Sequence, residues 1–120
     1  MNTNTAIDPD MMRIAADEAS GLLKALSNQH RLLILCCLID GEKSVGQLAE
    51  YLGIRDSTAS QHLALLRRDR IIVGRREGQT IWYRIESHVA RQVMEVLYSN
   101  FCTAPSETVP ADTAPADTDG

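Results

Sequence analysis

Residues 44–68 carry two helical patterns separated by a single glycine, and this spacing constrains the fold more than any other part of the chain. In the first pattern apolar residues share one helix face, and Gly53 is the residue type that most often ends a helix in the left-handed conformation. In the second, Ala59, Leu63 and Leu66 recur at spacings of four and three, which predicts a helix buried on one side. The stretch therefore predicts a helix-turn-helix.

The opposite face of the second helix is small and polar. We expect Asp56 to be its N-cap, since aspartate oxygens accept hydrogen bonds from the first free backbone N–H groups. Hydroxyl and amide groups near a helix N-terminus can reach phosphates and base edges without steric conflict. The candidates for DNA contact on this helix are Ser57, Thr58, Ser60, Gln61, His62 and Arg68. Alone, the pattern also fits an ordinary amphipathic helix pair, so the residues that follow must decide.

Those residues predict a β-hairpin. Residues 71–76 and Thr80–Ile85 alternate β-forming side chains, and the tight turn between them contains Glu77 and Gly78. Guanidinium groups beside such a turn are suited to phosphate. Three further candidates for contact with DNA lie at or beside the turn: Arg75, Arg76 and Gln79. A helix pair followed by a basic hairpin predicts a winged helix-turn-helix that binds double-stranded DNA.

The charge distribution agrees with this prediction, although the chain carries a formal net charge of −4. Residues 103–120 contain four carboxylates and no basic residue, and they account for that whole charge. Residues 54–84 hold seven arginines against three carboxylates, a local charge of +4. Because the local field steers phosphate binding, an acidic total does not argue against DNA.

Three further helices are expected around the helix-turn-helix. Pro9–Leu26 is amphipathic, residues 30–39 are apolar almost all round and should form the buried centre, and Ser87 can cap a last helix that reaches Phe101. The predicted fold is mainly α with a β-hairpin wing: four helices, two strands and a last helix. The first and last helices carry more apolar surface than so small a domain needs, which predicts a homodimer through them.

The remaining parts of the chain set its boundaries. We expect a disordered N-terminal tail at residues 1–8, the winged domain at residues 9–102 and a disordered acidic tail at residues 103–120, which is rich in proline and poor in apolar residues. The chain shows no secretory signal pattern and no apolar run of the roughly 18 residues that a membrane span needs. A cytoplasmic location without membrane contact is therefore expected.

Across about residues 11–102 the chain resembles the ArsR/SmtB winged-helix repressors. The matching segments are LLKALSNQHRLLIL, which resembles the family's entry into its second helix, STASQHLALLRRDRII in the helix-turn-helix, and GRREGQTIWYRI in the wing. The resemblance implies a homodimeric repressor that binds an imperfect palindrome and leaves it when an inducer arrives.

The metal-binding positions of that family are not filled here. Members that use thiolates before the recognition helix carry two cysteines where this chain has Ser44 and Gly46. Members that use the last helix need paired histidines, whereas this chain offers His88 with Gln92 and Glu95. We therefore expect no metal or other cofactor at these sites.

The cysteines resemble another branch, the persulfide-sensing SqrR/BigR-like repressors. In that branch a cysteine in the second helix and one that closes an aromatic-rich last helix form a disulfide or polysulfide bridge when reactive sulfur species appear. The resemblance implies Cys36 and Cys102 as the sensing thiols, with LYSNFC as the matching ending. Cys37 points about 100° away on a helix and departs from the pattern of that branch. It is expected to be a bystander, with a competing partner or a resolving thiol as the alternatives.

Several alternatives stay open at this point. The same cysteines could sense peroxide, or they could hold a thiophilic metal with the help of outside ligands. A thiol-dependent enzyme is more remote, because no general base, oxyanion donor or CxxC motif accompanies the cysteines. A winged domain that binds only protein is the last alternative, and salt-dependent binding to DNA would exclude it.

Overall fold

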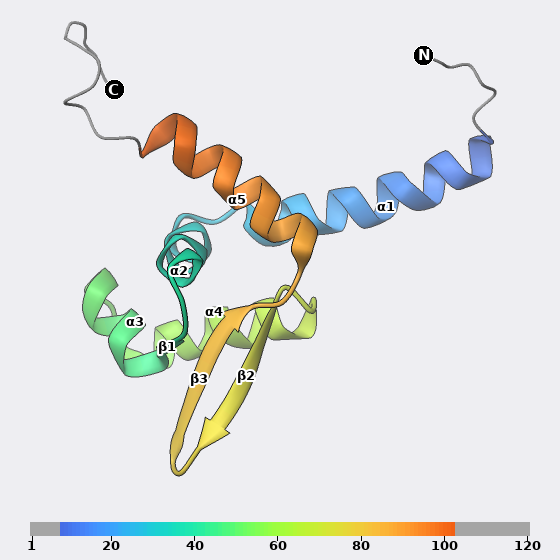
Figure 1. Ribbon diagram of the computed structural model, residues 1–120. Helices are drawn as coiled ribbons and strands as arrows, with labels where there is room; N and C mark the ends of the chain where they lie inside the picture. Colours follow the sequence, from blue (N-terminus) through green and yellow to red (C-terminus); the bar gives the residue numbers. More distant parts are fainter. Residues whose placement is uncertain (1–7, 103–120) are drawn as a thin grey trace, which may run out of the picture.

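The computed structural model describes residues 8–102, so the tails predicted at residues 1–8 and 103–120 lie outside the described residues except for Asp8. It is mainly helical with a β-hairpin wing, as predicted (Figure 1). The elements, in chain order, are α1 (Pro9–Leu26), α2 (Gln29–Ile39), β1 (Lys43–Ser44), α3 (Val45–Leu52), α4 (Asp56–Arg68), β2 (Ile72–Glu77), β3 (Thr80–Ile85) and α5 (His88–Phe101).

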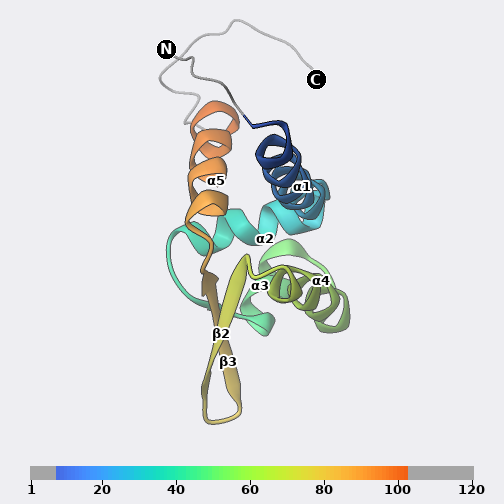
Figure 2. The ribbon, with the colours of Figure 1, turned by 90° about the vertical axis from the view of Figure 1, so that its right-hand side faces the viewer.

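Helix α2 is the centre of the fold. It contacts α1, α3, α4, α5 and β3, and both ribbon views show it between the other helices (Figures 1 and 2). The side chains of Ile34, Leu35 and Leu38 are fully excluded from solvent, which confirms the buried helix predicted here. Leu33 is 40% exposed, so one side of α2 still reaches the surface.

The helix-turn-helix is fixed by local hydrogen bonds. The Ser44 hydroxyl accepts from the Gln47 backbone N–H while the Gln47 side chain accepts from the Ser44 N–H, a reciprocal capping box at the start of α3. Gly53 ends α3 with φ 69°, the left-handed conformation that the sequence predicted. The N-cap prediction for α4 was wrong: Arg55 holds that position without a side-chain hydrogen bond, and Asp56 is the first helical residue. At that position the negative charge of the Asp56 carboxylate still stabilises the helix, because it lies near the positive end of the helix dipole.

The sheet has three antiparallel strands in the order β1-β3-β2. Strand β2 begins and ends one residue later than predicted, so Glu77 pairs with Thr80 and the turn is only Gly78 and Gln79. Gly78 adopts φ 64°, which suits a two-residue hairpin. Strand β1 was not predicted, since two residues carry no periodic signal. It pairs with β3 and joins the base of the wing to the helices (Figure 1).

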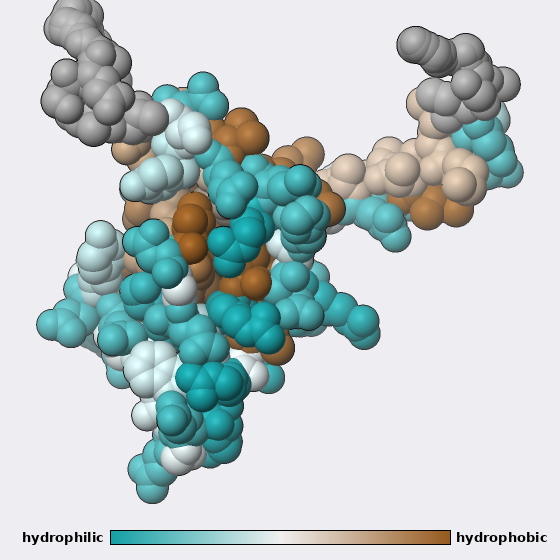
Figure 3. Space-filling model, in the orientation of Figure 1, coloured by the Kyte–Doolittle hydropathy of each residue, from teal (hydrophilic) through white to brown (hydrophobic). Residues whose placement is uncertain are grey.

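Helices α1 and α5 expose much of the apolar surface of the molecule (Figure 3). The Ser87 hydroxyl accepts from the Ala90 N–H and caps α5, as predicted. The large apolar side chains left exposed on these two helices are Met11, Met12, Ile14, Leu23, Val89, Val96, Tyr98 and Phe101. Within residues 8–102 no single helix is long and apolar enough to cross a membrane, although α1 and α2 pass that test jointly across a 93° bend.

Candidate DNA interface and thiol site

The polar face of α4 is open to solvent. Ser57, Ser60 and Gln61 are exposed, while Thr58 is half-buried. Leu63 and Leu66 hold the opposite face of the helix in the core. The core thus fixes the rotation of α4, and the predicted contact residues are presented together from its N-terminal half.

Two other predicted contacts on α4 have partners within the chain. Arg68 lies at the C-terminal end, where its Nε is 3.4 Å from a carboxylate oxygen of Asp69. His62 is half-buried, and its ring meets that of His30 on α2 edge-on, with 5.4 Å between centroids. Among the described residues its Nδ1 is buried without a hydrogen-bond partner. Burial, and then the nearby charge of Arg31, lowers the pKa of His62, which favours the neutral ring.

The wing arginines differ in their surroundings. Arg75 forms two hydrogen bonds to the Glu42 carboxylate, at 3.1 Å from Nε and 2.7 Å from the nearer terminal nitrogen. This bidentate contact lowers the pKa of Glu42 below its ordinary value. Arg76 and Gln79 are exposed, and a hydrogen bond joins the Arg76 guanidinium to the Gly78 carbonyl at 3.5 Å.

The structure brings Cys36 and Cys102 to the same cavity, although they are far apart in the sequence. Both thiols are free and line one cavity of about 280 Å³ between α2 and α5. The other residues that line this cavity are Gln29, Leu32, Leu33, Met94, Leu97, Tyr98 and Phe101. Burial raises the pKa of Cys36, and the neighbouring Cys102 raises it further by charge and by hydrogen bonding. Cys102 itself is exposed.

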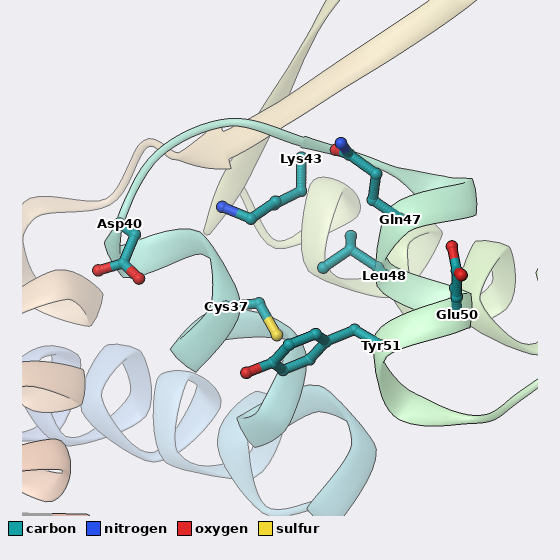
Figure 4. Close-up of a pocket in the computed structure, with 7 residues that line it drawn as sticks. All are labelled: Cys37, Asp40, Lys43, Gln47, Leu48, Glu50 and Tyr51. Carbon is teal, nitrogen blue, oxygen red and sulfur yellow. The ribbon is translucent and has the colours of Figure 1, made fainter.

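Cys37 faces another part of the molecule. It lines a larger cavity, of about 620 Å³, together with Asp40, Lys43 and Tyr51 among others (Figure 4). In that view the Cys37 sulfur points toward the ring of Tyr51 on α3. Burial raises the pKa of Cys37, while the charge of Lys43 acts in the opposite direction. The three thiols are therefore divided between two cavities. Within residues 8–102 no cluster of three or more His, Cys, Asp or Glu could hold a metal ion.

Two residues at these sites, Glu42 and His30, were not predicted as site residues from the sequence. Glu42 and Arg75 are 33 positions apart, and His30 and His62 lie on separate helices, so no local pattern connects either pair. A charged residue directly before a strand, with an arginine on a hairpin of the same sheet, is the signal that could have suggested the Glu42–Arg75 pair.

Comparison with known proteins identifies the family. Residues 28–73, which span α2, α3, α4 and the start of β2, match the family model described as bacterial regulatory protein, arsR family. The transcriptional activator HlyU of Vibrio cholerae is 46% identical over 83 residues, 69% of this chain and 77% of HlyU. The chain belongs to the ArsR family of bacterial regulatory proteins. This ArsR-family protein is a DNA-binding transcriptional regulator and not a thiol enzyme.

Other relatives cover more of the regulator. The biofilm growth-associated repressor of Xylella fastidiosa (strain Temecula1) is 40% identical over 102 residues, 85% of this chain and 90% of that protein. The structure of reduced HlyU superposes with a TM-score of 0.76 at 42% identity, over 78% of this chain and 98% of that one. The homodimeric winged helix-turn-helix domain Mb0332 of Mycobacterium bovis gives a TM-score of 0.69 at 30% identity, covering 80% and 89%.

Proposed function

We propose that this ArsR-family regulator is a homodimeric repressor that senses reactive sulfur species. In the proposal, a polysulfide links Cys36 to Cys102, and the linked dimer releases its operator DNA. The observation that carries it is the shared cavity: two free thiols from α2 and α5 meet there at the end of the described chain.

The lining of this cavity supports sulfur chemistry over metal binding. Apart from Gln29, the other described residues around the thiols are apolar or aromatic, and within residues 8–102 no carboxylate or imidazole lines the cavity. An apolar site disfavours a divalent cation but accepts sulfur chains, which are soft and poorly hydrated. Cys37 lines the second cavity and is not needed for the bridge.

The exposures of the two thiols suggest the order of reaction. Cys102 is exposed, whereas burial raises the pKa of Cys36, so the Cys102 thiolate attacks first. With an organic trisulfide it attacks the central sulfur and expels one thiolate. The Cys36 thiolate then attacks that same sulfur and expels the second. Overall, two protein thiols and one trisulfide give one three-sulfur bridge and two small thiols, so the protein is oxidised and the trisulfide is reduced.

The apolar faces of α1 and α5 support the dimer. Their exposed residues include Met11, Ile14, Val89 and Val96, and a second copy would remove these side chains from water. The relative Mb0332 is itself homodimeric. A bridge between α2 and α5 would shift α5, a helix of this interface, relative to the core. The shift would change the spacing between the two copies of α4, the recognition helices of the dimer.

The DNA contacts proposed for the reduced dimer come from α4 and the wing. Ser57, Thr58, Ser60 and Gln61 would enter the major groove, with His62 at the inner edge of that face. Arg68 and the wing residues Arg76 and Gln79 would lie along the phosphate backbone or minor groove. The polar, solvent-exposed setting of most of these residues supports this assignment.

The test uses DNA that the reduced protein selects from a random-sequence pool. Wild-type protein, the Cys36→Ser and Cys102→Ser variants, and Cys37→Ser as the matched neighbour are treated with an organic trisulfide. Intact mass and DNA affinity are then measured for each. We expect wild type and Cys37→Ser to lose both thiol hydrogens, gain about 32 Da per added sulfur and bind DNA about a hundredfold more weakly.

Release of DNA by the Cys36→Ser or Cys102→Ser variant after the same treatment would contradict the bridge. A bridged wild-type protein that keeps its DNA affinity would contradict the regulatory role. Parallel treatment with hydrogen peroxide and titration with zinc separate the two alternatives: release with peroxide alone would identify a peroxide sensor, and release with stoichiometric zinc would identify a metal sensor.

A further inference from the structure

Arg75 is held between two carboxylates. Besides its bidentate contact with Glu42, its second terminal nitrogen is 3.5 Å from a carboxylate oxygen of Glu77. About half of the Arg75 side chain remains accessible. A phosphate that approached this guanidinium would have to compete with two negative charges already in place.

The contact with Glu42 spans the whole sheet. Strand order is β1-β3-β2, so the strand that carries Arg75 and the strand that follows Glu42 are not neighbours. Arg75 pairs with Trp82 on β3, and Trp82 pairs with Ser44 on β1. Paired residues project from the same face of a sheet, so the Arg75 side chain crosses β3 to reach the residue before β1.

The helices hold the base of the hairpin and leave its distal part free. Ile72, Tyr83 and Ile85 are buried in the core, whereas residues 75–80 are exposed and the wing extends away from the helices (Figure 1). A planar guanidinium that binds a carboxylate through two parallel hydrogen bonds fixes direction as well as distance. The pair is therefore placed to set the angle at which the wing leaves the domain.

Arg76 provides the contrast, one residue further along β2. Its paired residue is Ile81, and the face on which Arg76 lies is opposite to that of Arg75. Among the described residues its side chain makes one hydrogen bond, to the Gly78 carbonyl at 3.5 Å, and that bond leaves its charge uncompensated. The two adjacent arginines thus differ in whether their charge is available to DNA.

We propose that Glu42 and Arg75 are positioning residues that orient the wing, and that Arg76 supplies the phosphate contact of this part of the hairpin. The proposal goes beyond the sulfur-sensing function and does not depend on it, because it concerns the reduced protein alone. In this arrangement the wing's contribution to sequence selectivity depends on a contact between two residues that need not touch DNA.

The experiment measures two quantities for reduced protein: the ratio of affinities for the selected DNA and a shuffled version of it, and the slope of log affinity against log salt. We expect Glu42→Gln and Arg75→Gln each to lower the ratio about threefold, with no larger loss in the double variant. Arg76→Gln should weaken binding to both DNAs alike and reduce the slope by about 0.9 per subunit.

The charge-swapped variant Glu42→Arg with Arg75→Glu decides between orientation and contact. Since it restores an ion pair across the sheet, we expect it to recover most of the lost ratio. A swap that fails to recover while its thermal unfolding stays like wild type would overturn the proposal, as would an Arg75→Gln slope that falls as far as that of Arg76→Gln. A gain in the ratio for Glu42→Gln would also overturn it, because Glu42 would then restrain a phosphate-binding arginine.

Discussion

The two halves of this regulator differ in what they leave exposed. The half formed by α3, α4 and the hairpin shows mainly polar residues (Figure 3), whereas most of the large apolar side chains left exposed lie on α1 and α5. The thiol cavity lies in the second half, between α2 and α5. In the proposed function, one half meets DNA and stays chemically passive, and the other meets its own copy and reacts with the inducer.

Because these surfaces lie on different elements, the proposed thiol site and the proposed DNA-binding surface can be altered independently, except through α2. That helix contacts α5 on one side and α3, α4 and β3 on others. In the proposed function, chemistry at Cys36 would therefore take place on the element that supports α4, the proposed recognition helix. The comparison between the halves can be tested by changing one of them at a time, or by changing the helix that they share.

The largest effect is expected from the apolar half. Val96 on α5 is 60% exposed, and Val96→Glu would place a charge in the proposed dimer interface. We expect monomers in analytical ultracentrifugation. We also expect a loss of DNA affinity of about a hundredfold or more, because a monomer contacts one half-site whereas the dimer contacts two at once. Tyr51→Glu, at an exposed aromatic residue of the other half, is the control and should remain dimeric. A dimeric Val96→Glu protein would place the interface elsewhere.

The next effect is expected from the shared helix. Leu35 is fully buried at the centre of α2, and Leu35→Ala removes its packing without changing charge. We expect the free energy of unfolding to fall by about 3 kcal/mol in urea titrations. Leu65→Ala, at a side chain that is 37% exposed, should cost much less. Equal losses for the two variants would contradict the assignment of α2 as the core.

A smaller effect is expected on the polar half. Gln61 is exposed on α4, and its amide can form two hydrogen bonds to an adenine edge. We expect Gln61→Ala to reduce discrimination at one base pair of the selected DNA by about 1 to 3 kcal/mol, with stability unchanged. Competition binding with single-base variants of that DNA measures it. Uniform weakening across all variants would assign Gln61 to the backbone instead.

The smallest effect concerns pH. Because the folded pKa of His62 is lowered, the unfolded chain binds a proton more readily than the folded protein. The stability that this group contributes is complete above the unfolded pKa of about 6.5 and is lost as pH falls from there through the folded pKa. We expect urea midpoints to decrease between pH 7.5 and 5.5, and His62→Phe to reduce that decrease. An identical pH dependence in the variant would exclude His62 as the cause.

The sequence predicted most of the fold because the signals are local. Apolar spacing placed the helices, Gly53 and Gly78 marked the two turns, and Ser87 marked the start of α5. The error at Asp56 is also local, since either of two adjacent residues can begin a helix that follows a short turn. The α-helical and hairpin elements could therefore be predicted almost to the residue.

The candidate sites could be predicted less fully, because they depend on contacts between distant residues. The partnership of Cys36 with Cys102 came from a family resemblance, and spacing alone does not supply it. The Glu42–Arg75 pair and the contact between His30 and His62 require the packed arrangement of the sheet and helices. Composition identified Arg75 as a cation but could not show that two carboxylates compensate its charge.

The central position of α2 has a further consequence for when the regulator responds. If bridging of Cys36 and Cys102 weakens DNA binding, then at equilibrium DNA binding must disfavour bridging by the same factor. Operator-bound dimers would resist oxidation, and unbound dimers would be oxidised first. The supply of unoccupied regulator would then buffer the promoter against small amounts of polysulfide, so the threshold of the response would depend on how many copies the cell makes.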